Sequence, residues 1–272
     1  MSASFLDTTI VVSAASPNVD LKVRRKMADA IRLNQPCYMA AYAIRELLAG
    51  AVRVLCDTHN TILASETAAE ALLALLRRSP MEGRTREARV AALADQLGRA
   101  FQSNPVGSRD LIKQEILDDM ALRVVRFWRE AQRIPFVEPV QPLSCFSGGS
   151  ISFGSSGELR GPNDSFGCDP NARCSAAAYI YSDRGALKKM IDAMKPDSLP
   201  EAAAAKRENS ARRKALKELE AGGPVKFNKQ RCRALGDAYF AAQCPPGTTV
   251  LTTNISDFQP LCSALGKKVS EP

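Results

Sequence analysis

The stretch GDAYFAAQCPPGTTVLTTNISDFQPL, residues 236–261, places three structural signals in quick succession. Its first part has the apolar pattern of a helix, Pro-Pro-Gly at 245–247 marks a turn, and the β-branched run at 248–255 predicts a strand. Asp237 stands at the predicted start of the helix, and Asp257 follows the predicted strand. Helix, turn and strand in this order are typical of an α/β fold.

The same alternation extends over the rest of the chain. The apolar, β-branched run at 4–15 predicts a buried parallel strand, with Asp7 within it or at its end. Residues 36–51 predict a short strand that leads into a helix containing Glu46. Further helices are predicted at 62–79, 86–102, 111–132, 169–194 and 233–244, and a further strand at 133–143. This pattern predicts a three-layer α/β/α fold, in which helices cover both faces of a central, mostly parallel sheet.

Two segments interrupt this alternation within what we expect to be a single domain, residues 1–272. The segment 144–168 is rich in Gly and Ser, which is typical of a long loop or a small hairpin inserted between core elements. The segment 195–230 is rich in Ala, Lys, Arg and Glu and contains few large apolar residues. We expect it to form a basic helical arm that extends from the core.

The positive charge of the chain is local. The whole chain carries a formal net charge of +8, and residues 184–233 alone contain fourteen Lys or Arg and six Asp or Glu. A basic surface attracts polyanions, of which nucleic acid is the commonest, although a solvated helix is an equally good interpretation. On the first interpretation, Arg212, Arg213 and Lys214 contact the phosphate backbone of RNA.

Other features of the sequence exclude several classes of protein. There is no signal-peptide-like segment and no run of eighteen apolar residues, so we expect a cytoplasmic protein without a membrane partner. Eight cysteines form no Cys-x-x-Cys pair and the chain has a single histidine, His59, which argues against a zinc site.

Acidic residues occur where an α/β fold binds its ligands. Asp7 belongs to the first predicted strand, Glu46 to an early helix, Asp237 to a late helix, and Asn254 and Asp257 follow the last predicted strand. Buried carboxylates are rare unless they are paired or bind a metal. If these side chains converge at one edge of the sheet, a hard divalent cation such as Mg²⁺ or Mn²⁺ would neutralise their repulsion.

Each acidic residue also has a structural interpretation. Asp7 could end a strand and cap a turn, and Glu46 could pair with a neighbouring arginine on a helix surface. Asp237 could be a helix N-cap, and Asp257 could form an Asx-turn before Phe258. The residue types alone leave these alternatives open.

Three stretches of the chain together resemble the motif regions of the PIN-domain family, and in the same order. They are FLDTTIVV at 5–12, YAIRELLAG at 42–50 and LGDAYFAAQCPPGTTVLTTNISDF at 235–258. Members of this family are metal-dependent ribonucleases, and many are toxins of toxin–antitoxin pairs. The resemblance therefore implies an endoribonuclease that hydrolyses RNA phosphodiester bonds.

The resemblance also implies roles for individual residues and partners. Asp7, Glu46, Asp237 and Asp257 would bind Mg²⁺ or Mn²⁺, and Asn254 would bind the metal or orient a water molecule. RNA is the expected substrate, single-stranded DNA is also compatible, and an antitoxin, another protein or a second copy of the chain are candidate partners. The chain departs from the family pattern by its length and by Asn at 254, so the alternative is a non-catalytic PIN-fold module that binds nucleic acid or protein.

Overall fold

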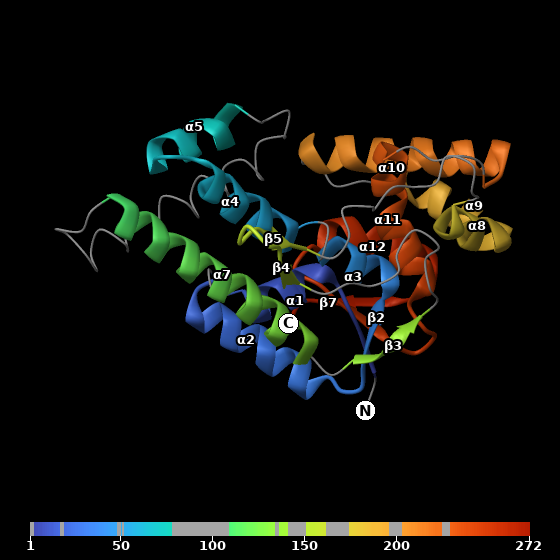
Figure 1. Ribbon diagram of the computed structural model, residues 1–272. Coiled ribbons are helices and arrows are strands. Elements are labelled where there is room, and N and C mark those ends of the chain that lie inside the picture. Colours follow the sequence, from blue (N-terminus) through green and yellow to red (C-terminus); the bar gives the residue numbers. More distant parts are fainter. Residues whose placement is uncertain are drawn as a thin grey trace.

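The computed structural model describes most of the chain and places an α/β core at its centre (Figure 1). The described residues are 3–16, 19–47, 50, 52–77, 109–133, 136–140, 151–161, 174–195, 203–224 and 229–272. Of the helices in these ranges, none has the length and apolar character needed to cross a membrane.

The core of the fold is a five-stranded sheet in the order β3-β2-β1-β6-β7. Every neighbouring pair of strands in it is parallel. The strands are β1 (Ser4–Leu6), β2 (Cys37–Ala40), β3 (Phe136–Val140), β6 (Thr249–Leu251) and β7 (Lys268–Ser270). The predicted α/β class and parallel sheet are confirmed, whereas β7 was not predicted.

The strand order creates a switch point between β1 and β6. From β1 the chain builds β2 and β3 on one side and later returns to build β6 and β7 on the other side. Leu6 and Leu251 are paired in register, so the carboxyl ends of β1 and β6 lie side by side. In open parallel sheets, the crevice at such a point is the usual place for a ligand.

The run 4–15 is divided differently from the prediction of one strand. β1 ends at Leu6, and helix α1 begins at Thr8. Ile10, Val11 and Ala15 are the buried residues of α1, which is the spacing of a helix face and not the alternation of a strand. Asp7 therefore stands at the junction between strand and helix.

The remaining helices follow the sequence pattern with shifted boundaries. They are α2 (Leu21–Leu33), α3 (Ala41–Leu47), α4 (Arg53–Ala64), α5 (Ala68–Arg77), α7 (Arg109–Arg133), α8 (Ser175–Ser182), α9 (Arg184–Ala193), α10 (Ala203–Gly222), α11 (Lys229–Gln243) and α12 (Ile255–Ala264). The predicted helix at 62–79 is the end of α4 followed by α5, and the predicted helix at 86–102 lies outside the described residues.

The Gly/Ser-rich segment contains a small antiparallel hairpin of β4 (Ser152–Phe153) and β5 (Leu159–Arg160). The amide of Asn60 fixes this hairpin to α4, because it donates to the carbonyl of Leu159 at 2.9 Å and accepts from the Leu159 N–H at 2.7 Å. Residues 144–150 and 162–168 of the predicted insertion lie outside the described residues.

The expected basic arm is a helix, but it does not extend from the core. α10 packs against α9 and α11 (Figure 1). Asn209, Arg212, Leu216 and Leu219 are buried along one face of the helix. Their spacing of three and four residues gives α10 a narrow stripe that faces the core, which the high content of Lys, Arg and Ala concealed. The prediction of a protruding arm is therefore wrong for the described part of this segment.

Aromatic contacts join the central strand β1 to helices α11 and α12. The ring of Phe5 in β1 lies 4.5 Å from that of Phe240 in α11, and the ring of Phe240 lies 5.1 Å from that of Phe258 in α12. All three side chains are buried. This packing holds α11 and α12 beside the carboxyl ends of β1 and β6.

Candidate functional site

Asp7 lies at the switch point of the sheet. Its backbone N–H donates to the carbonyl of Leu251 at 3.1 Å, which continues the pairing of β1 with β6 beyond the last strand residue. Its Oδ2 accepts hydrogen bonds from the hydroxyls of Thr9 at 2.6 Å and Thr252 at 2.7 Å. Burial raises the pKa of Asp7, and these hydroxyls act in the opposite direction by stabilising the carboxylate.

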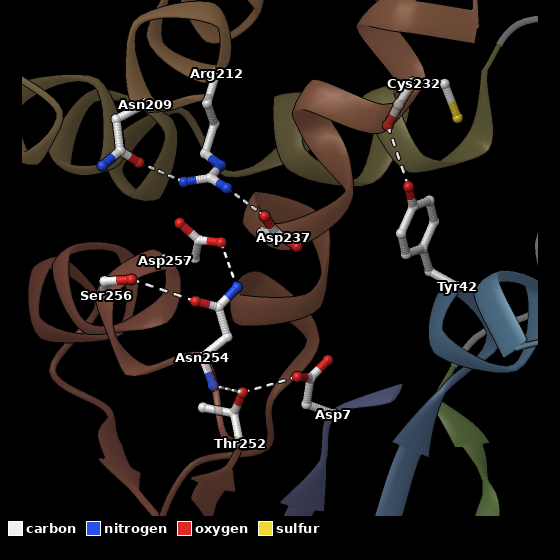
Figure 2. Close-up of polar contacts among 10 residues, drawn as sticks. All are labelled: Asp7, Tyr42, Asn209, Arg212, Cys232, Asp237, Thr252, Asn254, Ser256 and Asp257. Carbon is white, nitrogen blue, oxygen red and sulfur yellow. Dashed lines mark hydrogen bonds and ion pairs between the residues drawn. The ribbon is translucent and has the colours of Figure 1, made fainter. Parts of the chain in front are cut away.

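Asp237 lies within α11 and is not at its start, because α11 begins at Lys229. The prediction that Asp237 opens this helix is wrong, and with it the interpretation of Asp237 as an N-cap. Of the residues before Leu235, Lys229, Gln230, Arg231 and Arg233 are polar, so the apolar pattern that marked the helix began later than the helix itself. Asp237 is instead the partner of Arg212 on α10, whose Nη2 donates to its Oδ2 (Figure 2).

The pKa of Asp237 is raised from 3.8 to about 6. Burial is the largest cause, and the charges of Asp257 and Asp7 act in the same direction. The Arg212 guanidinium acts against them by favouring the ionised form. Asp7 and Asp257 are therefore close enough to act on the ionisation of Asp237, and we name Asp7, Asp237 and Asp257 the acidic cluster.

Asn254 and Asp257 face each other at the start of α12. Asn254 is the N-cap residue, and its side-chain amide donates to Oδ2 of Asp257 (Figure 2). The backbone N–H of Asn254 donates to Oγ1 of Thr252 at 2.9 Å. The same hydroxyl donates to Asp7. Asp7 is thus linked to Asp257 through Thr252 and then through Asn254, whose backbone bonds Thr252 and whose side chain bonds Asp257. Asp257 is buried, although it is only the third residue of its helix.

Glu46 lies at the edge of this group. It is in α3, as predicted, and its side chain is exposed. The hydroxyl of Thr8, the residue after Asp7, donates to Oε2 of Glu46 at 3.1 Å. Tyr42, one turn before Glu46, has a raised pKa mainly through burial, with Glu46 and Asp237 as further causes. The charges of Glu46, on the same helix as Tyr42, and of Asp237, on α11, therefore both act on this tyrosine.

A glycine allows α3 to approach α11 here. A Cβ atom on Gly236 would overlap the ring and hydroxyl of Tyr42, so only glycine fits at this position without a shift. The hydroxyl of Tyr42 donates to the carbonyl of Cys232 at 3.5 Å, which places its ring against the preceding turn of α11. Gly236 therefore sets the distance between the helices that carry Glu46 and Asp237.

The three basic residues predicted to bind RNA differ in accessibility. Arg212 is only 3% exposed and is held by Asp237 and by Oδ1 of Asn209. Its prediction as a surface contact for the RNA backbone is wrong, because its guanidinium neutralises a buried carboxylate. Arg213 is half-buried and Lys214 is exposed on the same helix, and their role in RNA binding stays a prediction.

The donors of the acidic cluster fit a hard divalent cation by their chemistry. Carboxylate and amide oxygens are ligands that Mg²⁺ and Mn²⁺ prefer. Arg212 balances one of the three carboxylates, and a divalent ion would balance the other two. Within the described ranges, however, no group of three or more His, Cys, Asp or Glu side chains is already arranged as a metal site. A bound cation would therefore require these side chains to move toward one another.

Sequence reasoning missed the part that three residues play in the site. Thr252 links the acids, Gly236 sets the helix spacing and Arg212 supplies a buried positive charge. Thr252 lies inside the predicted strand at 248–255 and directly after the observed strand β6, so its hydroxyl could have been recognised as a candidate only with the strand end placed correctly. The contact of Arg212 with Asp237 spans twenty-five residues and two helices, so no local pattern indicates it.

Comparison of the chain with protein-family models, with curated proteins and with solved structures found no match.

Proposed function

We propose that this protein is a metal-dependent endoribonuclease of PIN type that hydrolyses RNA phosphodiester bonds. One observation carries the proposal. Asp7, Asp237 and Asp257 come from three separate segments; hydrogen bonds through Thr252 and Asn254 link Asp7 to Asp257 beside the switch point of a parallel sheet, and the charges of both aspartates act on Asp237. These are the positions that match the acidic motifs of the family, and a ligand-binding crevice is expected at this place in the fold.

The proposal includes a three-layer arrangement. α1 packs against α2 and α7, whereas α11 packs against α8, α10 and α12. Figure 1 supports two separate groups of helices, with α2 and α7 at the lower left and α8 to α12 on the right. We infer that these groups cover opposite faces of the sheet, as an α/β/α fold requires.

Mg²⁺ or Mn²⁺ is the cofactor that we propose. Asp7, Asp237 and Asp257 would hold the ion, with Glu46 at the edge and Asn254 as a neutral ligand or a hydrogen-bonding partner of water. When bound, such an ion supplies a water molecule activated for attack and neutralises charge on the phosphate. Thr252 and Thr9 orient the carboxylate of Asp7 through their hydroxyls, and Asn254 orients that of Asp257.

We propose that the exposed Lys214 and the half-buried Arg213 of α10 contact the RNA backbone. Each such contact releases counterions, so binding should weaken as salt increases. An antitoxin, another protein partner and a homodimer remain compatible with the family resemblance, and so does single-stranded DNA as a substrate.

A direct experiment tests the nuclease proposal. The full chain is incubated with total RNA in Mn²⁺ or in EDTA, and the ends of the products are mapped. We expect cleavage in Mn²⁺ that is lost in EDTA and in Asp7→Asn. Asp192→Asn is the matched control, because Asp192 is an exposed aspartate on α9 that pairs with Lys195. Cleavage that survives both EDTA and Asp7→Asn would contradict the proposal.

The alternative is a non-catalytic PIN-fold module that binds nucleic acid or a protein. The observation that favours it is the ion pair between Arg212 and Asp237, since this pair already satisfies one of the proposed metal ligands. A thermal shift separates the two functions. A stabilisation by Mn²⁺ that disappears in Asp7→Asn supports the nuclease, and RNA binding without any effect of divalent ions supports the module.

A further inference from the structure

The environment of the Arg212 guanidinium is unusual for a residue in a highly basic segment. Its side chain is 4% exposed, Nη2 donates to Oδ2 of Asp237, and Nη1 donates to Oδ1 of Asn209 (Figure 2). A cation is rarely buried this deeply unless it is paired and hydrogen-bonded, because removal from water is costly. Arg212 meets both conditions. Its ion-pair partner, Asp237, belongs to the acidic cluster, and its hydrogen-bond partner, Asn209, lies one helical turn earlier on α10.

The charges around Arg212 explain why a cation belongs here. The acidic cluster contains three carboxylates, and Arg212 forms an ion pair with one of them, that of Asp237. A divalent ion alone would leave one carboxylate unbalanced. An RNA phosphodiester is itself an anion, so an unbalanced carboxylate would repel it at the place where it must bind. With Arg212 present, the ion and the guanidinium together balance the cluster.

The exposure of the two partners places Arg212 behind Asp237. The side chain of Asp237 is 28% exposed, whereas that of Arg212 is 4% exposed. A ligand that approaches from solvent therefore meets the carboxylate first. Arg212 acts on such a ligand through Asp237 and through its electric field, which burial makes stronger because the surroundings screen it less than water does.

We propose that Arg212 is the built-in countercharge of the acidic cluster, a positioning residue that fixes Asp237 and lets an RNA phosphodiester approach the carboxylates. The inference rests on the proposed function and adds the group that makes the site accept an anion. Asn209 is part of the same arrangement, because it holds the second nitrogen of the guanidinium and so sets its orientation.

Two other roles for Arg212 give different results when it is replaced. A purely structural ion pair would affect stability, while the folded fraction would bind and cleave RNA as before. A blocking group that competes with the metal for Asp237 would, on removal, leave a protein that cleaves faster. Of the three roles, only the countercharge predicts that replacing Arg212 weakens RNA binding and slows cleavage without weakening metal binding.

The test compares the full chain with Arg212→Gln, Arg212→Lys and Lys217→Gln. Lys217 is the matched control, because it is an exposed cation on the same helix and its replacement removes the same charge. The probe is a fluorescein-labelled single-stranded RNA of random sequence. Mn²⁺ affinity is measured by titration, RNA affinity by anisotropy, and kcat and KM by cleavage, each normalised to the folded fraction.

The expected result is a separation of metal binding from RNA cleavage. In Arg212→Gln, Mn²⁺ should bind at least as tightly as in the wild type, because a repelling cation has been removed. KM should rise, and kcat should fall by about 100-fold, the loss typical when one preorganised charge-stabilising group is removed. Arg212→Lys should recover most of the RNA affinity because it keeps the charge, and Lys217→Gln should resemble the wild type.

The outcomes distinguish this inference from the proposed function. If the wild type cleaves RNA and Arg212→Gln retains its kcat and KM, or cleaves faster, the countercharge role is overturned and the nuclease stands. If the wild type neither binds Mn²⁺ nor cleaves RNA, the proposed function fails and takes the inference with it. Should Arg212→Gln not fold, Arg212→Met keeps much of the length of the side chain without its charge, and an unchanged kcat and KM in that variant overturn the inference.

Discussion

The ring of Phe5 lies 4.5 Å from the ring of Phe240, and this contact joins the central strand to the helix that carries Asp237. Asp7 follows Phe5 by two residues, and Asp237 precedes Phe240 by one helical turn. Phe258, which packs on Phe240, comes directly after Asp257. The same aromatic packing that forms the core therefore brings the three aspartates together.

Phe240→Ala should destabilise the protein and disperse the acidic cluster. Phe240 is 2% exposed, and truncation of a buried phenylalanine costs about 3–5 kcal/mol of unfolding free energy. The measurement is urea unfolding followed by circular dichroism. Phe153→Ala is the control, since Phe153 is 60% exposed and should contribute little. Equal stabilities of the two variants would show that the aromatic contact does not hold α11 on the sheet.

The stability of the metal-free protein should fall as the pH rises through about 6. The pKa of Asp237 is raised from 3.8 to about 6, so the folded protein binds this proton more tightly than the unfolded chain does. The stabilisation is therefore fully present below the ordinary pKa and is lost as the pH passes the folded-state value. Asp237→Asn, which stays neutral, should exceed the wild type at neutral pH by on the order of 1 kcal/mol.

The comparison with Asp237→Asn isolates this single group. Asp7, whose pKa burial also raises, is present in both proteins, so its contribution largely cancels in the difference. Urea unfolding of both proteins in EDTA over a pH series gives the difference directly. It should be largest at neutral pH and shrink toward acidic pH. A difference that is constant over the series would contradict the raised pKa.

Gly236→Ala should separate α3 from α11. The added methyl group would overlap Tyr42, and overpacking of this kind costs about 1–3 kcal/mol. Since Tyr42 and Glu46 lie on the same helix, the proposed cleavage should also decrease. Tyr42→Leu provides the space that the methyl group needs, so the double variant should be less destabilised than the sum of the single variants. Strict additivity would show that the two residues do not interact.

The sequence was sufficient to predict the α/β class with a parallel sheet, and it led to the prediction that acidic residues gather at one edge of that sheet. Asp7 could be placed within the first strand or at its end because apolar residues lie on both sides of it, and Glu46 could be placed in a helix because Ile44 and Leu47 mark its apolar face. The convergence of the acids followed from a general property of parallel sheets, in which the carboxyl ends of the strands lie at one edge.

The features that were missed depend on contacts between distant segments. Arg212 belongs to a run of charged residues, and only the packing of α10 on α11 turns it toward Asp237. The extent of α11 was underestimated because its first turn, Lys229–Arg231, is polar, so the position of Asp237 within the helix was wrong. β7 has only three residues and mixed polarity, which gives too weak a periodic signal to predict a strand.

Thr252→Val tests whether the hydrogen-bond chain between Asp7 and Asp257 serves the site. Thr252 is fully buried, its Oγ1 donates to Asp7 at 2.7 Å, and the same atom accepts from the Asn254 N–H at 2.9 Å. Valine has nearly the same shape but lacks the hydroxyl, so both partners lose a bond. An unfolding cost of about 1–3 kcal/mol is expected for leaving buried polar groups unsatisfied.

The same substitution should also make metal binding more sensitive to pH. The Thr252 hydroxyl lowers the pKa of Asp7 by stabilising its carboxylate, so its removal should raise that pKa further. Protons then compete more strongly with Mn²⁺, whose affinity should decrease at neutral pH and recover in more alkaline solution. Titrations of Mn²⁺ at two pH values measure this effect, with Thr252→Ser as the control that keeps the hydroxyl. If Thr252→Val binds Mn²⁺ like Thr252→Ser at both pH values, the hydroxyl stabilises the fold without tuning Asp7.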